Sequence, residues 1–135
     1  MDDNTATEQP LGESAARFIA YIRDVRQLSP HTVSNYQRDL LSLERFCESG
    51  GRRGIEHLVE ADLREWASQL HRRGLAGGSI QRSLSAVRSF YNYLGRESGL
   101  LRNPAASVKA PRKPRKLPKT LDADQVGKYL NFDAD

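Results

Sequence analysis

The stretch from Ser29 to Gly51 carries the clearest structural signal in the sequence. Ser29 is a favourable N-cap, and Pro30 occupies the first helical position, where a missing amide proton does no harm. Apolar side chains then recur at steps of three and four residues until the Gly50-Gly51 pair: Val33, Tyr36, Leu40, Leu43 and Cys47. A helix with one apolar stripe must pack against other elements, so the sequence predicts a helical bundle.

Three further segments have the same periodicity, and we expect helices over residues 13–27, 61–73 and 79–98. Their stripes are, in turn, Phe18, Ile22, Val25 and Leu28; Leu63, Trp66, Ala67 and Leu70; and Ile80, Leu84, Val87, Tyr91 and Leu94. Ser79 is the expected N-cap of the last helix, while Gly74 and Gly99 suit helix ends. No segment indicates a strand, so the expected fold is all-α with four helices.

Catalytic and metal-binding motifs are not recognisable in the sequence. The histidines are scattered, and there is no glycine-rich phosphate loop. The single cysteine, Cys47, lies on an apolar stripe and is expected to be a buried structural thiol. We therefore expect no metal and no cofactor, and we do not expect the chain by itself to be an enzyme.

The first apolar stretch, Ala15 to Ile22, is interrupted by Arg17 and follows an acidic, polar start. Neither a signal peptide nor a transmembrane helix fits this pattern. We expect a soluble, cytoplasmic protein.

The net charge of +4 is unevenly distributed. Acidic residues gather at both ends, whereas the segment from Arg72 to Lys119 holds twelve basic residues and one acid, Glu97. Such a local excess favours a polyanion, and nucleic acid is the commonest one inside cells. A membrane surface is the lesser alternative, because no strongly apolar helix face remains unpaired beside these charges.

The polar face of the last helix contains no carboxylate: its residues are Gln81, Arg82, Ser85, Arg88, Ser89, Asn92 and Arg96. A face selected only for solubility would include acids, since each i,i+4 ion pair stabilises a helix by about 0.2–0.5 kcal/mol. Amide side chains can pair with adenine edges, and arginine can bind guanine or phosphate. The face predicts insertion into a DNA major groove, and the alternative is a basic surface helix without a ligand.

Secondary DNA-binding candidates lie on the other helices. The helix after Ser29 offers His31, Thr32, Asn35, Arg38 and Arg45, although Asp39 and Glu44 lie close by in the sequence. A plain solvated surface is an equal alternative for this helix. Ser79 is a further candidate, as are Arg72 and Arg73, which would otherwise complement a helix dipole.

The segment from Lys109 to Lys119 has three prolines and six basic residues, so it cannot be a helix. It is either a solvated tether or an extended linker along a phosphate backbone, and we favour contact through Arg112, Lys113, Arg115, Lys116 and Lys119. Thr120 to Val126 then resembles a helix start. We expect this helix to belong to a second domain, which would make the chain a fragment.

Three collinear motifs resemble the core-binding domain of tyrosine recombinases, the phage integrase family. They are Ser29-Pro30-His31-Thr32 followed by Tyr36 and Asp39-Leu40, then Arg82 to Tyr91, then Asn103-Pro104-Ala105. The tail from Lys109 looks like the interdomain linker of XerC-like recombinases. The resemblance covers about Leu11 to Asp135.

The resemblance implies a SAM-like bundle of four helices whose second and fourth helices face the major groove. It implies a flexible acidic start over 1–12, a core-binding domain over 13–108, a basic linker over 109–119 and the beginning of a catalytic domain over 120–135. In the parent enzyme, a tyrosine nucleophile and an arginine-rich pocket would cut and rejoin DNA without metal or high-energy cofactor. Those residues would lie beyond Asp135, and Tyr129 does not match the nucleophile.

The resemblance also implies partners. They are double-stranded DNA with a dif-type half-site, a XerD-like sister recombinase in a heterotetramer and a division-associated DNA translocase, acting in chromosome dimer resolution and segregation at cell division. Two alternatives stay open: the arm of a phage, integron or transposon integrase, or a helical protein-interaction module, since family arms touch neighbouring protomers.

Overall fold

The computed structural model describes residues 11–100 and 102–111. In these residues, helix α2 (Glu13–Ala20) continues into a π-helical turn, η1 (Tyr21–Val25). Helix α3 (Pro30–Ser49), a short 3-10 turn, η2 (Ile55–His57), and helices α4 (Glu60–Arg72) and α5 (Gly77–Ser98) follow. The described ranges contain no strand, which confirms the predicted all-α fold with four helices.

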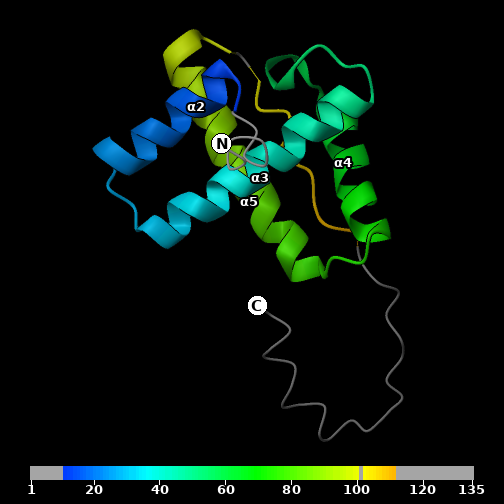
Figure 1. Ribbon diagram of the computed structural model, residues 1–135. Coiled ribbons are helices and arrows are strands. Elements are labelled where there is room, and N and C mark those ends of the chain that lie inside the picture. The colour runs from blue at the N-terminus through cyan, green and yellow to red at the C-terminus, as the bar shows by residue number, and fades with distance from the viewer. Residues whose placement is uncertain (1–10, 101, 112–135) are drawn as a thin grey trace, which may run out of the picture.

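Helix α5 is the central element, because it packs against α2, α3 and α4. Figure 1 shows that α3 and α5 cross, and that α2 and α4 lie on opposite sides of the point where they cross. No helix in the part of the chain that the structure describes is long and apolar enough to cross a membrane.

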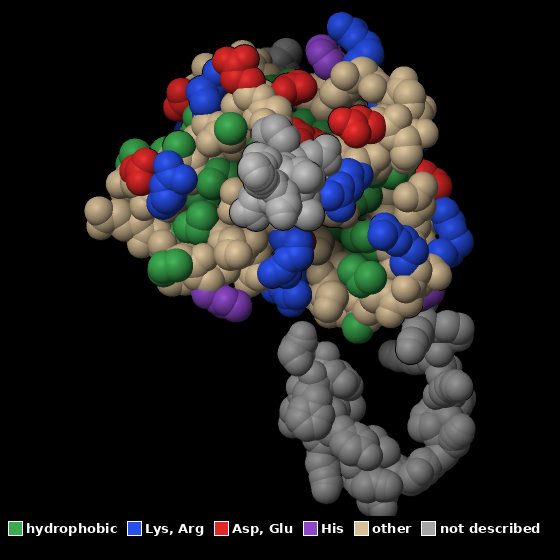
Figure 2. Space-filling view, in the orientation of Figure 1, with side chains coloured by type: hydrophobic (Ala, Val, Ile, Leu, Met, Phe, Trp, Pro, Cys, Tyr) green, Lys and Arg blue, Asp and Glu red, His purple; other side chains and the backbone are tan. Residues whose placement is uncertain are grey.

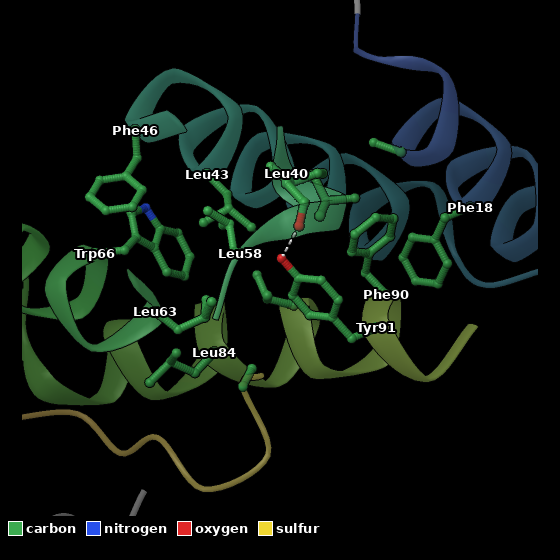
Figure 3. Close-up of a cluster of buried hydrophobic side chains, with 14 of the residues drawn as sticks. Phe18, Leu40, Leu43, Phe46, Leu58, Leu63, Trp66, Leu84, Phe90 and Tyr91 are labelled. Carbon is green, nitrogen blue, oxygen red and sulfur yellow. Dashed lines mark hydrogen bonds between the residues drawn. The ribbon is translucent and has the colours of Figure 1, made fainter. Parts of the chain in front are cut away.

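Most residues of the predicted apolar stripes lie in the core, and Leu40, Leu43, Leu63 and Leu84 are fully buried in it (Figure 3). Two large polar side chains inside it are paired, as buried polar groups usually are. The Tyr91 hydroxyl donates to the Ile55 carbonyl oxygen at 2.7 Å, and burial raises the pKa of this phenol. The Trp66 indole N–H donates to Ser42 Oγ at 3.3 Å.

Cys47 is buried and free, as predicted. Burial raises the pKa of its thiol to about 11. The thiolate, which is the reactive form, is therefore scarce at neutral pH.

The end of the first helix differs from the prediction at Val25, which is 70% exposed instead of packed in the stripe. The π-helical turn adds one residue to the last turn, and this rotates Val25 out of the core. Gln27 then adopts a left-handed conformation (φ 54°), and the Leu28 amide donates to the Ile22 carbonyl at 3.0 Å. The turn returns Leu28 to the edge of the core.

The predicted cap of α3 is confirmed, because Ser29 Oγ accepts the Thr32 amide at 3.2 Å and Pro30 is the first helical residue. The predicted Ser79 cap is wrong. Helix α5 begins at Gly77, and the Ser79 amide already donates to the Ala76 carbonyl at 3.0 Å within the first turn.

Residues 102–111, here called the strap, follow α5 and run back along it, as Figure 1 shows. Ala105 and Val108 of the strap are 0% and 2% exposed, so they complete the core. The reversal begins at Gly99, whose φ of 75° is a left-handed helix end.

Candidate nucleic-acid interface

The carboxylate-free face of α5 is divided in the structure, and one part of it holds the strap. Gln81 Oε1 accepts the Ala110 amide at 2.8 Å, and Asn92 Oδ1 accepts Asn103 Nδ2 at 3.0 Å. Arg88 donates from Nε to the Ala105 carbonyl at 3.0 Å and from Nη2 to the Val108 carbonyl at 2.9 Å. These polar groups of Gln81, Arg88 and Asn92 are therefore engaged by the strap.

The other part of the face is open to solvent. Arg82 and Ser85 are exposed and Ser89 is half-buried. Within the described residues, the Arg82 guanidinium forms no hydrogen bond or ion pair, so its donors remain available to a ligand. Arg96 lies at the far end of α5, where its Nη2 donates to the Tyr21 hydroxyl at 3.4 Å.

Helix α3 carries a chain of polar contacts on its exposed face. Asn35 Nδ2 lies 3.4 Å from His31 Nε2, and Arg38 Nη2 donates to Asn35 Oδ1 at 2.6 Å. Thr32 is part of the helix cap, since its hydroxyl accepts Ser29 Oγ at 3.0 Å. These contacts hold His31, Asn35 and Arg38 in one row without a carboxylate, although the row still keeps free donors for a ligand.

Glu44 is turned away from this row. Its Oε2 accepts the Gly12 amide at 2.9 Å, at the start of α2, and burial raises its pKa. Two acids lie close to the α3 candidates in the sequence. Of these, Glu44 faces the start of α2 and does not lie in the row. Arg45 is exposed and forms no side-chain bond within residues 11–100 and 102–111.

Asp39 connects the two helices at their crossing. Its Oδ1 accepts Ser83 Oγ of α5 at 2.9 Å. Burial raises the pKa of this carboxyl, although the Ser83 hydrogen bond and the charges of Arg38 and Arg82 act in the opposite direction. Arg38 and Arg82 directly precede the two residues of this hydrogen bond, so we treat the open parts of α3 and α5 beside it as one surface. We call this surface the crossing face; it consists of His31, Thr32, Asn35, Arg38, Asp39, Arg82, Ser85 and Ser89.

The sequence indicated Asp39 only as an acid close to the α3 candidates, and its role at the crossing was not predicted. Its position beside Leu40, at the edge of the apolar stripe, was the only available signal. The strap was missed as well, because its contacts join residues separated by 11 to 29 positions.

The remaining candidates lie elsewhere. Arg72 forms an ion pair with Glu65 at 3.1 Å, and Arg73 is exposed at the end of α4. Ser79 is in the first turn of α5. Arg112, Lys113, Arg115, Lys116 and Lys119 lie outside the described residues, as does the helix expected after Thr120.

The surface in Figure 2 is unevenly charged. Acidic side chains lie in its upper half, whereas the lower edge shows basic and histidine side chains and no acidic one. No group of His, Cys, Asp and Glu that could hold a metal ion occurs in the described ranges.

Comparison with known proteins gives one family model and several relatives that agree with one another. Residues 15–98 match the family model of the phage integrase N-terminal SAM-like domain. The chain is 40% identical over 135 residues to a tyrosine recombinase XerC of Xanthomonas campestris pv. campestris, covering 97% of this chain and 42% of the relative. It is 42% identical over 114 residues to XerC of Alcanivorax borkumensis, covering 84% of this chain and 36% of the relative.

A XerC of Escherichia coli O157:H7 is 38% identical over 123 residues, covering 91% of this chain and 41% of the relative. The chain thus spans about two fifths of the length of the curated relatives it matches. No solved structure matches the chain significantly. With its bundle of helices and the match over most of that bundle, the chain belongs to the phage integrase family, as an XerC-like N-terminal SAM-like domain.

Proposed function

We propose that this chain is the DNA-binding arm of a site-specific tyrosine recombinase of the XerC type, and that the crossing face contacts double-stranded DNA. The observation that carries the proposal is the pair Arg38 and Arg82. They lie on two helices that are joined by the Asp39–Ser83 hydrogen bond, and each presents a guanidinium on a face with one acid.

The chemistry of the crossing face suits a major groove. Arginine can donate two hydrogen bonds to guanine O6 and N7 or to a phosphate, and asparagine can pair with the N6 and N7 of adenine. Asn35, Arg38 and Arg82 supply these groups, while the small side chains of Ser85 and Ser89 allow a close approach of the helix. His31 and Thr32 at the α3 start are suited to phosphate contact.

For the full-length protein, we propose the DNA recombination that the name of the relatives, tyrosine recombinase, indicates, together with the site and partners that the resemblance of the motifs implies. It would cleave and rejoin DNA at a dif-type site through a tyrosine nucleophile, together with a XerD-like sister recombinase and a division-associated DNA translocase. Chromosome dimer resolution in the cytoplasm would be its task. An arm of a phage, integron or transposon integrase is the alternative within the same family.

The test is binding of the chain to a duplex that contains a dif-type half-site, over a range of salt concentrations. We expect the logarithm of the affinity to fall with the logarithm of salt concentration, with a slope of about 0.9 per phosphate contacted. Arg82→Gln should weaken binding by at least about fivefold, because one arginine contact to DNA contributes about 1–3 kcal/mol. The matched control is Arg64→Gln on α4, an exposed arginine paired with Glu60, which should bind like the native chain.

Two outcomes would contradict the proposal. One is the absence of salt-dependent binding to any duplex, and the other is equal loss from the Arg82 and Arg64 variants. Stable self-association without DNA, seen by crosslinking, would instead favour a protein-interaction module.

A further inference from the structure

Arg88 makes the densest set of contacts between α5 and the strap. Its Nε and Nη2 donate to the carbonyl oxygens of Ala105 and Val108 at 3.0 and 2.9 Å. Asn103 Nδ2 in turn donates to the backbone oxygen of Arg88 at 3.1 Å. A guanidinium can hold two carbonyls because its N–H groups form a rigid fork, whereas the ammonium of lysine is a compact point charge.

The strap is held at several points between Asn103 and Ala110. Ala105 and Val108 are buried between its two ends, and the Ala110 amide donates to Gln81 Oε1 at 2.8 Å. Gln81 directly precedes Arg82, the open arginine of the crossing face. The end of the strap, Ala110 and Pro111, therefore lies close to the part of α5 that we propose to contact DNA.

We propose that Arg88 is a positioning residue: by clamping the strap, it fixes the point from which the basic run Lys109–Lys119 starts, so that this run and the crossing face engage the same duplex. The DNA part of this inference rests on the proposed function above. Release of the strap would free residues 102–111 and so lengthen the connection between the bundle and the rest of the basic run by about ten residues. The effective concentration of a tethered group falls roughly as the −3/2 power of tether length, so the benefit of the basic run would fall about three- to tenfold.

The clamp itself is tested by hydrogen exchange of the full chain without DNA. Arg88→Lys keeps the charge but loses the fork, so we expect the amides of Val108 and Ala110 to exchange about tenfold faster. Arg88→Gln should act in the same way. Arg82→Gln, on the same helix, is the matched control and should leave both amides unchanged. Native protection of these amides in Arg88→Lys would overturn the inference.

The positioning role is tested by DNA binding in a double-mutant cycle. The second change replaces Arg112, Lys113, Arg115, Lys116 and Lys119 by glutamine. With native Arg88, this neutral run should lower the affinity for the half-site duplex and reduce the salt slope by about 0.9 per phosphate lost. Arg88→Lys should weaken the native chain about three- to tenfold but have little effect on the chain with the neutral run, so the two changes are not additive.

Equal loss from Arg88→Lys in both backgrounds would overturn the inference, because Arg88 would then contact DNA itself. If the Arg88 variants unfold, the Gln81→Ala variant replaces them in both experiments. It removes only the hydrogen bond between Gln81 and the Ala110 amide, and Gln81 is exposed. It should speed exchange at Ala110 and reduce the benefit of the basic run, and a failure of both effects would overturn the inference. If the native chain binds no duplex, the proposed function fails, and the exchange experiment still decides whether Arg88 holds the strap.

Discussion

Asp39 places a negative charge within the crossing face, beside two arginines that we expect to contact phosphate or base edges. Its hydrogen bond with Ser83 joins α3 to α5, yet burial raises its pKa. The ionised form is therefore less favourable in the folded chain than in the unfolded chain. The hydrogen bond needs only an acceptor oxygen, which an amide also provides.

Asp39→Asn should leave the chain at least as stable at pH 7 as the native protein. The folded state of the native chain binds the Asp39 proton more tightly than the unfolded state. Its stability therefore decreases as pH rises from the unfolded pKa, about 3.9, through the raised folded pKa, and the loss persists above it. The substitution removes this contribution. Urea unfolding at pH 4 and pH 7 measures it, and marked destabilisation at pH 7 would show that the charge itself is needed.

The Tyr91 hydroxyl forms a buried hydrogen bond with the Ile55 carbonyl oxygen. Tyr91→Phe should destabilise the chain by about 1–3 kcal/mol, because the buried Ile55 carbonyl would lose its partner. Tyr93→Phe is the matched control on the same helix, since the Tyr93 hydroxyl forms no hydrogen bond within the described residues. Urea midpoints distinguish the two, and equal effects would contradict the importance of the buried bond.

At the scale of elements, α3 shows how far a sequence can specify a helix. Its start and end follow from local chemistry: Ser29 accepts a first-turn amide, Pro30 lacks the amide proton, and the helix ends before Gly50-Gly51. The stripe of α3 is buried because its period matches the helix. None of these features depends on a distant residue, which is why they could be predicted.

Ser29→Ala should destabilise the chain by about 1 kcal/mol, since the Thr32 amide would lose its acceptor at the N-terminus of α3. Thermal unfolding followed by circular dichroism measures the change. Ser34→Ala is the matched control, because Ser34 is an exposed serine inside the same helix and its Oγ caps nothing among the described residues. No difference between the two variants would mean that the cap contributes little.

The polar face of α5 shows where prediction from sequence stops. A helical period tells which side chains point away from the core, and Gln81, Arg82, Arg88 and Asn92 all do so. It does not tell what contacts them. The strap lacks any period, and its atoms form hydrogen bonds with Gln81, Arg88 and Asn92. The uniform face predicted from the sequence is therefore two surfaces in the folded chain.

At the scale of the whole molecule, the strap determines how much chain the bundle needs. The family match covers residues 15–98, whereas Ala105 and Val108, further along, are as deeply buried as the centre of the core. Burying one valine side chain stabilises a fold by about 1.5–3 kcal/mol. The strap also supplies the acceptors of the Arg88 guanidinium. A small domain has a total stability of about 5–15 kcal/mol, so these contributions are a considerable part of it.

A chain that ends at Leu100 should therefore be several kcal/mol less stable than one that ends at Pro111, by the burial and hydrogen-bond contributions together. The chain ending at Pro111 retains every described strap contact, so it is the reference for this comparison of urea midpoints. Val108→Ala in the full chain is the matched local change and should account for about 1–2.5 kcal/mol of the difference, because it leaves a cavity at a fully buried site. If the chain ending at Leu100 unfolds at the native midpoint, α2 to α5 are sufficient alone, and the strap only rests on a finished core.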